Sequence, residues 1–401
     1  MALIVQKFGG SSVANAQKLQ NVCNIITRTY DAGNDVVVVL SAQGDTTDDL
    51  IDKAKEINPH ASKREMDVLL STGEQISIAL AAMCIEKMGY PVVSLTGWQV
   101  GMNTSSDYSS ARIRKVEGDR LRKELDKHRI VLVAGFQGVN KYGDITTLGR
   151  GGSDTTAVAL AVALKADLCQ IYTDVDGVYT TDPRLVEKAR KLDAITYDEM
   201  LELASLGAQV LHNRSVELAK HYHIQLEVLS SFSGNPGTIV KEVVNMEKTY
   251  ISGVAQDKKI ARVALVGLED IPGMAYKLFS LLAKEKINVD IILQSIGRND
   301  TKDISFTIPE GDKERCQEVL EANKSVLKFQ TMSVSTDVAK VSIVGSGMAD
   351  NPGVAAQMFE ALYNAHINIH MISTSEIKIS VLIDKQDSER ALRAIHDKFF
   401  D

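Results

Sequence analysis

An internal repeat near the C-terminus restricts the fold more than any other feature of this sequence. Residues 263–295 match residues 341–375, and from Pro272 and Pro352 onward the two copies align at a constant offset of 80 residues. Each copy reads as a strand, a Pro-Gly turn that opens a helix, and a second strand. The residues after each copy predict a further strand, helix and strand. We therefore predict two βαββαβ units of about 70 residues each.

The part of the chain before the repeat alternates apolar strand patterns with helical patterns. The run at 36–40 contains only valines and a leucine, as in strands that are buried on both faces of a sheet. This alternation predicts an α/β fold with a mostly parallel sheet covered by helices. The main expected strands lie at residues 2–5, 36–40, 90–95, 130–134 and 168–172.

Two glycine-rich turns in this first part each stand between a strand and a helix. Residues 7–12 read KFGGSS and residues 149–154 read GRGGSD. In such a turn, backbone N–H groups converge beside a helix N-terminus, which is the geometry that binds phosphates and other anions. Lys7 and Arg150 each add a positive charge. We therefore expect two anion sites.

The loop after the strand at 168–172 is acidic, with Asp174, Asp176 and Asp182. Ligands of parallel sheets bind at the carboxyl ends of the strands, where this loop begins. A calcium loop is excluded, because glycine comes at the fourth instead of the sixth position and no glutamate follows at the twelfth. The sequence Gly-Lys-Ser/Thr is absent, which excludes a Walker A site. The two anion sites and this loop together predict phosphoryl transfer from a nucleotide.

The composition of the chain further limits the classes of protein to which it can belong. A chain of 401 residues with 44% hydrophobic residues is long enough for two or three domains with large cores. A net charge of −7 without a basic run argues against nucleic acid as a partner. The four cysteines lie far apart, without metal or redox spacing. No signal peptide and no uninterrupted apolar stretch of membrane-spanning length is present, so we expect a cytoplasmic protein that needs no membrane.

Five motifs together resemble the monofunctional aspartate kinases over essentially the full length. They are KFGGSS at 7–12, STGE at 71–74, GRGGSD at 149–154, TDVDGVYTTDPR at 173–184 and STSEIKISVLI at 373–383. The resemblance implies an amino-acid-kinase domain at 1–245, a linker and a first ACT domain at 246–335, and a second ACT domain at 336–401. It also places Met246, a possible internal start of a separate regulatory half, in the charged connector between them.

The same resemblance implies the reaction and its residues. The β-carboxylate of L-aspartate would attack ATP to give 4-phospho-L-aspartate, with Mg²⁺ as second cofactor, in the first step of lysine, threonine and methionine biosynthesis. Lys7 and Asp154 take catalytic roles. The implied nucleotide site is Lys7, Phe8, Gly9, Gly10, Ser11, Ser41, Thr173, Asp174, Tyr179, Asp182 and Arg184. The implied aspartate site is Thr47, Glu74, Arg150, Gly151, Gly152 and Ser153.

Elementary chemistry agrees with these roles. A β-carboxylate is already ionised at neutral pH, so the reaction needs no catalytic base. The catalytic task is to align two anions and offset their repulsion, which suits Lys7, Mg²⁺ and backbone amides. Glu74 would accept the substrate ammonium, and Arg150 would bind its α-carboxylate through a bidentate fork.

ACT domains bind amino-acid effectors, which here implies feedback inhibition by lysine, threonine or both, in a homodimer or larger homo-oligomer. The expected effector residues lie near the Pro-Gly turn and the following strand of each copy: Asp270, Gly273, Met274, Ala275, Asn288, Gln294, Asn351, Asn368, Ile369 and Thr374. Two alternatives stay open. One is another enzyme of this fold that acts on glutamate, acetylglutamate or UMP, and the other is a catalytically silent amino-acid sensor.

Overall fold

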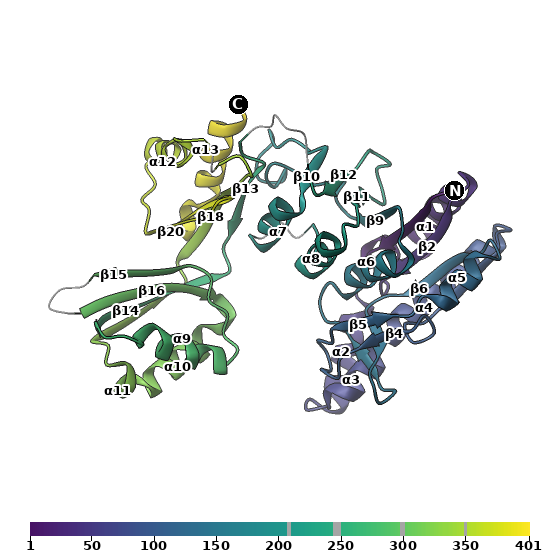
Figure 1. Cartoon of the computed structure of the whole chain (residues 1–401), viewed down its shortest axis with the longest axis horizontal. Helices are drawn as coiled ribbons and strands as arrows, with labels where there is room; N and C mark the ends of the chain where they lie inside the picture. Colours follow the sequence, from purple (N-terminus) through teal and green to yellow (C-terminus); the bar gives the residue numbers. More distant parts are fainter. Residues whose placement is uncertain (207–209, 244–249, 297–300, 349–350) are drawn as a thin grey trace. The chain divides into compact units, whose positions relative to one another are not determined.

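The structure is a computed structural model in which the chain forms two compact units (Figure 1). The first unit comprises residues 1–179 and 191–246, and the second comprises residues 180–190 and 247–401. The described residues are all except 207–209, 244–249, 297–300 and 349–350. Met246, at the expected boundary, therefore lies outside the described residues.

An eight-stranded sheet forms the centre of the first unit. Its neighbouring strands are parallel except for one antiparallel pair, β11 with β12, which confirms the predicted mostly parallel sheet. Valine-rich strands occupy its middle, as expected for strands covered on both faces. In sheet order the strands are β10 (Ala194–Thr196), β12 (Thr238–Lys241), β11 (Leu226–Ser230), β9 (Leu168–Thr173), β1 (Leu3–Phe8), β2 (Asp35–Leu40), β6 (Ile130–Ala134) and β3 (Val92–Leu95).

Helices pack against this sheet and bury its apolar side chains. Ile26 of α1 and Ile85 of α4 share one hydrophobic cluster with Val38 of β2. Helix α6 is apolar on all sides and nearly every residue of it is buried, which is typical of a helix enclosed by a sheet and other helices. The helices of this unit are α1 (Ala16–Asp31), α2 (Thr46–Ile57), α3 (Lys63–Leu70), α4 (Thr72–Lys87), α5 (Asp119–Leu125), α6 (Gly152–Leu164), α7 (Tyr197–Ser205) and α8 (Asn213–Tyr222).

Residues 63–87 are long and apolar enough to cross a membrane by length and composition alone. In the structure they form two successive helices, α3 and α4, that meet at Ser71. Ile78 and Ile85 pack into the core beside the large sheet, and Glu74 is buried in the first turn of α4. The segment is therefore a core element of the first unit.

A second, small sheet in the first unit has no counterpart in the sequence-based expectation. It consists of four short strands in the order β5 (Ile113–Val116), β4 (Met102–Thr104), β7 (Gln137–Val139) and β8 (Ile145–Thr147). Strand β8 leads directly into the GRGGSD turn at 149–154. This sheet therefore supports one of the two predicted anion sites.

The second unit contains two modules, each a four-stranded antiparallel sheet with helices packed against it (Figure 1). The first module has the predicted βαββαβ order along the chain. Its elements are β14 (Ile260–Glu269), α9 (Met274–Lys284), β15 (Ile292–Ile296), β16 (Thr301–Pro309), α10 (Lys313–Ala322), α11 (Lys324–Leu327) and β17 (Thr331–Ser335). The second module contains β13 (Gly253–Asp257), β18 (Val338–Val344), α12 (Val354–Asn364), β19 (Met371–Thr374), β20 (Lys378–Asp384) and α13 (Ser388–Phe400).

The closing strand of the second module corrects one prediction. We expected the second copy, like the first, to end with a helix and a final strand, but its last element is α13, which ends at Phe400. The position that β17 holds beside β14 in the first module is held beside β18 by β13, which precedes the first module in sequence. The range 246–335 thus contains a strand of the second module's sheet.

Candidate active site

Lys7 and Asp154 bring the two glycine turns together. Lys7 lies near the C-terminal end of β1, Asp154 lies in the first turn of α6, and Lys7 Nζ is 2.7 Å from Asp154 Oδ1. Their side chains are only 12% and 14% exposed. A partly desolvated ion pair of this kind is held firmly, because each charge would lose its compensation without the other. The structure thus joins the two residues that we assigned to catalysis.

The first glycine turn is closely packed against the neighbouring strand end. A Cβ atom on Gly10 would lie 2.6 Å from the carbonyl oxygen of Ala42, so glycine is required there. Ser41 N donates to the carbonyl of Phe8, which places Ser41 beside the turn that contains Gly9, Gly10 and Ser11. The Phe8 ring is fully buried and stacks on Tyr172, so only the Phe8 backbone can face a ligand. Thr47 follows in the first turn of α2.

Glu74 is a buried carboxylate with one unused oxygen. It is 3% exposed, and its Oε1 accepts a hydrogen bond from Ala42 N at 3.1 Å. Among the residues that the structure describes, no hydrogen-bond partner reaches Oε2. Burial raises the pKa of Glu74 to about 7, against the opposing effect of backbone hydrogen bonds. An arriving ammonium group would satisfy the free oxygen and favour ionisation.

The second glycine turn is enclosed by His212, Phe136 and Gly135. Gly151 has φ +69°, and a Cβ atom there would lie 2.2 Å from His212 Cγ. A Cβ atom on Gly152 would lie 2.8 Å from Phe136 Cδ2, and one on Gly135 would lie 2.6 Å from Ser153 Oγ. The Arg150 side chain is exposed beside this turn. The His212 side chain thus packs directly against Gly151 of this turn.

Asp67 and Arg214 hold the chain just before the second turn through hydrogen bonds. Neither role was predicted from the sequence. Asp67 is fully buried, and its carboxylate accepts hydrogen bonds from Thr147 N and Thr147 Oγ1, each at 2.8 Å. It also accepts one from Ser109 N at 2.9 Å. Arg214 donates from Nη1 to the carbonyl of Leu148 at 2.6 Å. Position 67 reads in sequence as an ordinary polar residue of an amphipathic helix.

The acidic loop is divided between the two units. Thr173, which ends β9, donates to Asp174 within the first unit. Tyr179 also belongs to this unit, but its hydroxyl donates to Asp176 at 2.7 Å, which raises the pKa of Tyr179 to about 12. The other two loop residues that we predicted in the nucleotide site, Asp182 and Arg184, form an ion pair of 2.8 Å within the second unit. Their part in a nucleotide site stays a prediction.

Residues 180–190 are attached to the second module of the second unit. Val254 N donates to the carbonyl of Thr180 at 2.7 Å, and Arg393 Nε donates to the carbonyl of Leu185 at 3.0 Å. The Thr180 hydroxyl is 2.9 Å from Nε2 of His396, which is fully buried. The later part of the acidic loop is therefore packed as part of the second unit.

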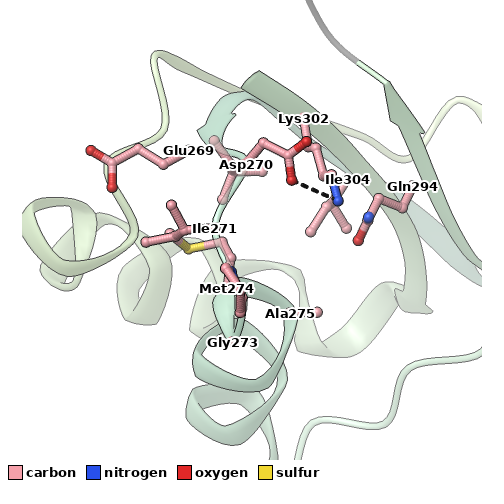
Figure 2. Close-up of a pocket in the computed structure, with 11 residues that line it drawn as sticks. Glu269, Asp270, Ile271, Gly273, Met274, Ala275, Gln294, Lys302 and Ile304 are labelled. Carbon is pink, nitrogen blue, oxygen red and sulfur yellow. Dashed lines mark ion pairs between the residues drawn. The ribbon is translucent and has the colours of Figure 1, made fainter. Parts of the chain in front are cut away.

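Five of the expected effector residues line one pocket of 290 Å³ in the first module (Figure 2). They are Asp270, Gly273, Met274, Ala275 and Gln294. Sequence reasoning missed Lys302 in this pocket, whose Nζ lies 2.7 Å from Asp270 Oδ1. Asn288 is exposed and is not part of the lining.

The other expected effector residues belong to the second module and do not line this pocket. Asn351 precedes α12 and donates to the carbonyl of Gly347 at 2.7 Å. Asn368 and Ile369 lie between α12 and β19, and Thr374 ends β19. Their effector role stays a prediction.

Comparisons with known proteins agree with this arrangement. Residues 2–230 match the model of the amino acid kinase family, and residues 263–323 and 341–399 each match an ACT domain. An aspartokinase of Bacillus sp. (strain MGA3) is 53% identical over 400 residues, covering 100% of this chain and 97% of the relative. The chain belongs to the aspartate kinases. An aspartate kinase of Pseudomonas putida is 50% identical, covering 100% of this chain and 98% of the relative.

Solved aspartate kinases share the fold along the whole chain. Escherichia coli aspartokinase III in complex with aspartate and ADP has a TM-score of 0.85 at 26% identity, with both chains fully covered. The same enzyme in complex with lysine and aspartate has a TM-score of 0.79, again with both chains fully covered. The aspartate kinase assignment implies ATP-dependent phosphorylation of aspartate.

Proposed function

We propose that this aspartate kinase transfers the γ-phosphoryl group of ATP to the β-carboxylate of L-aspartate and is feedback-regulated through its ACT modules. The observation that carries the catalytic part is the 2.7 Å contact between Lys7 and Asp154. This contact places a lysine ammonium where two glycine turns meet. Backbone amides and a fixed cation are the groups that stabilise a transferring phosphoryl group.

The roles of the substrate residues follow from their charges. Glu74 offers an unused carboxylate oxygen for the α-ammonium, and Arg150 offers an exposed guanidinium for the α-carboxylate. When both α-groups are bound, the β-carboxylate is the one left to attack. It is already ionised, so no residue has to remove a proton. Asp154 holds the Lys7 ammonium in place while charge moves on the phosphoryl group.

Mg²⁺ would offset phosphate charge during this transfer. Among the described residues, no group of three or more His, Cys, Asp or Glu side chains is arranged to hold a metal ion. Isolated carboxylates of this kind fit a Mg²⁺ ion that is held mainly by nucleotide phosphates and water, with one or two protein carboxylates at most. The candidates for such contacts are Asp174, which directly follows β9, and Asp154, which contacts Lys7 near the carboxyl end of β1.

Regulation is proposed to act through the pocket of the first module. The complex of Escherichia coli aspartokinase III with lysine supports an amino acid as effector. Lysine, threonine or both would bind, in a homodimer or larger assembly, and shift the population between active and inactive forms. The enzyme would then act in the cytoplasm, at the first step of lysine, threonine and methionine biosynthesis.

The test is an ATP-dependent assay with a panel of acceptors. ADP release is measured with aspartate, glutamate, acetylglutamate and UMP, and acyl phosphates are trapped with hydroxylamine. We expect ADP release and hydroxamate with aspartate alone, and loss of both signals in Lys7→Ala. Equal activity with glutamate would contradict the aspartate assignment. If none of the four acceptors supported activity, the catalytically silent sensor would be favoured.

A further inference from the structure

The charged groups around the pocket of the first module already form ion pairs within the chain. Asp270 pairs with Lys302 at 2.7 Å, and Glu269 pairs with Lys328 at 2.9 Å. In Figure 2, the Asp270–Lys302 pair lies on the pocket side, whereas the Glu269 side chain points away from it. The two carboxylates and the two lysines compensate each other, so the pocket region carries no net charge from these groups.

The remaining lining is apolar or neutral, apart from the start of one helix. Leu268, Met274 and Ile304 supply apolar surface, and Gln294 supplies a neutral amide. Helix α9 starts at Met274 after Gly273, which has φ +91° and leaves the first backbone N–H groups of the helix open. Those N–H groups favour an anion such as a carboxylate.

We propose that Lys302 makes this pocket selective for α-amino acids with neutral side chains over those with basic side chains. The inference rests on the proposed effector function of the same pocket. The α-ammonium of the ligand would replace Lys302 at Asp270, and the α-carboxylate would lie between the released Lys302 ammonium and the start of α9. One ion pair is thereby exchanged for two.

A basic ligand meets a different balance of charge. Its side-chain ammonium adds a second positive charge where Asp270 is already paired with the α-ammonium and the neighbouring Glu269, whose side chain points away from the pocket (Figure 2), is paired with Lys328. This extra charge is repelled by the ammonium of Lys302, which remains nearby. Asp270 and Lys302 are 40% and 32% exposed, so screening keeps the effect moderate, and a change of about five-fold in relative affinity is the expected scale.

The experiment compares Lys302→Met with the full-length wild type by titration calorimetry, using threonine and lysine as probes. Methionine keeps the apolar stem of the side chain and removes only the charge. Lys277→Met is the matched control, because Lys277 lies exposed on α9 and does not line the pocket. Asp270→Asn identifies binding to this pocket, since it removes the proposed partner of the α-ammonium.

We expect wild type and Lys277→Met to bind threonine more tightly than lysine at the site that Asp270→Asn abolishes. In Lys302→Met, the ratio of lysine Kd to threonine Kd should fall by about five-fold or more, and Lys302→Gln should behave alike. A ratio that changes by less than two-fold in both variants would overturn the role of Lys302 while leaving effector binding intact. Absence of any Asp270-dependent binding in the wild type would instead overturn the proposed effector function, and this inference with it.

Discussion

The ammonium nitrogen of Lys7 lies 2.7 Å from Oδ1 of Asp154, which joins the end of β1 to the first turn of α6. Lys7 precedes the glycines of the first turn and Asp154 follows those of the second. This contact therefore holds the two turns close together. The pair is largely shielded from water, which strengthens its electrostatic effect on any phosphate bound nearby. The catalytic proposal depends on this pairing.

Removing the Lys7 charge should slow the chemical step. We expect Lys7→Ala to lower kcat by roughly 10²-fold or more, the scale of losing one preorganised charge, with a smaller change in the aspartate KM. Steady-state kinetics against ATP and aspartate measures this. Lys18→Ala, a lysine of α1 that lies over Phe232, is the control and should retain activity. A Lys7→Ala enzyme with wild-type kcat would contradict the role.

Arg150 should act on substrate binding instead. Loss of a charged, bidentate contact typically costs a factor of roughly 10 to 100, so Arg150→Ala should raise the aspartate KM by that amount. The ATP KM should stay close to that of the wild type. The assignment would be wrong if the aspartate KM did not move.

Glu74 should make aspartate binding depend on pH. Its pKa of about 7 in the folded protein means that the ionised form, which the substrate ammonium requires, grows as pH rises through 7. The aspartate KM should therefore fall between pH 6 and pH 8. In Glu74→Gln we expect weak aspartate binding at every pH, and a KM profile as steep as that of the wild type would exclude Glu74 as its source.

The same shift predicts an opposite trend in stability. The folded pKa lies above the ordinary value of 4.5, so between these values the folded state holds a proton that the unfolded state has released. Stability therefore falls as pH rises from about 4.5 to about 7, by about 3 kcal/mol in total. Denaturant unfolding of wild type and Glu74→Gln at pH 5 and pH 8 measures this. Between pH 5 and pH 8, the free energy of unfolding should fall less in Glu74→Gln than in the wild type. An equal fall in both proteins would contradict the raised pKa of Glu74.

Asp67 should behave as a positioning residue for the second glycine turn. In Asp67→Asn, an amide nitrogen would replace one of the carboxylate oxygens that accept hydrogen bonds from backbone N–H groups, such as that of Thr147. The loss of such a bond should lower the free energy of unfolding by about 1–3 kcal/mol. We expect the aspartate KM to rise several-fold while the ATP KM changes little. Asp52→Asn, on the exposed face of the neighbouring helix α2, is the matched control. Equal rises of both KM values would indicate general damage instead.

The glycine turns, the parallel sheet and the repeat were predictable because each depends on local sequence. Two adjacent glycines after an apolar run predict a turn, and a Pro-Gly pattern that recurs at a constant spacing predicts two similar modules. The role of Asp67 was not predictable, because it arises only when α3 packs beside β8. Likewise, nothing near residues 253–257 indicates pairing with β18, since that strand lies beyond the whole first module in sequence. Lys302 was missed because it lies in β16, whereas its partner Asp270 follows β14, and only the pairing of these two strands brings the residues together.

The most direct test of the catalytic account is the position of the phosphoryl group on the product. Wild-type enzyme is incubated with ATP, aspartate and hydroxylamine, and the hydroxamate is compared by chromatography and mass spectrometry with authentic α- and β-aspartyl hydroxamates. Because Glu74 and Arg150 are proposed to hold the two α-groups, we predict the β-hydroxamate alone. Formation of the α-hydroxamate, or ADP release without any hydroxamate, would contradict the account.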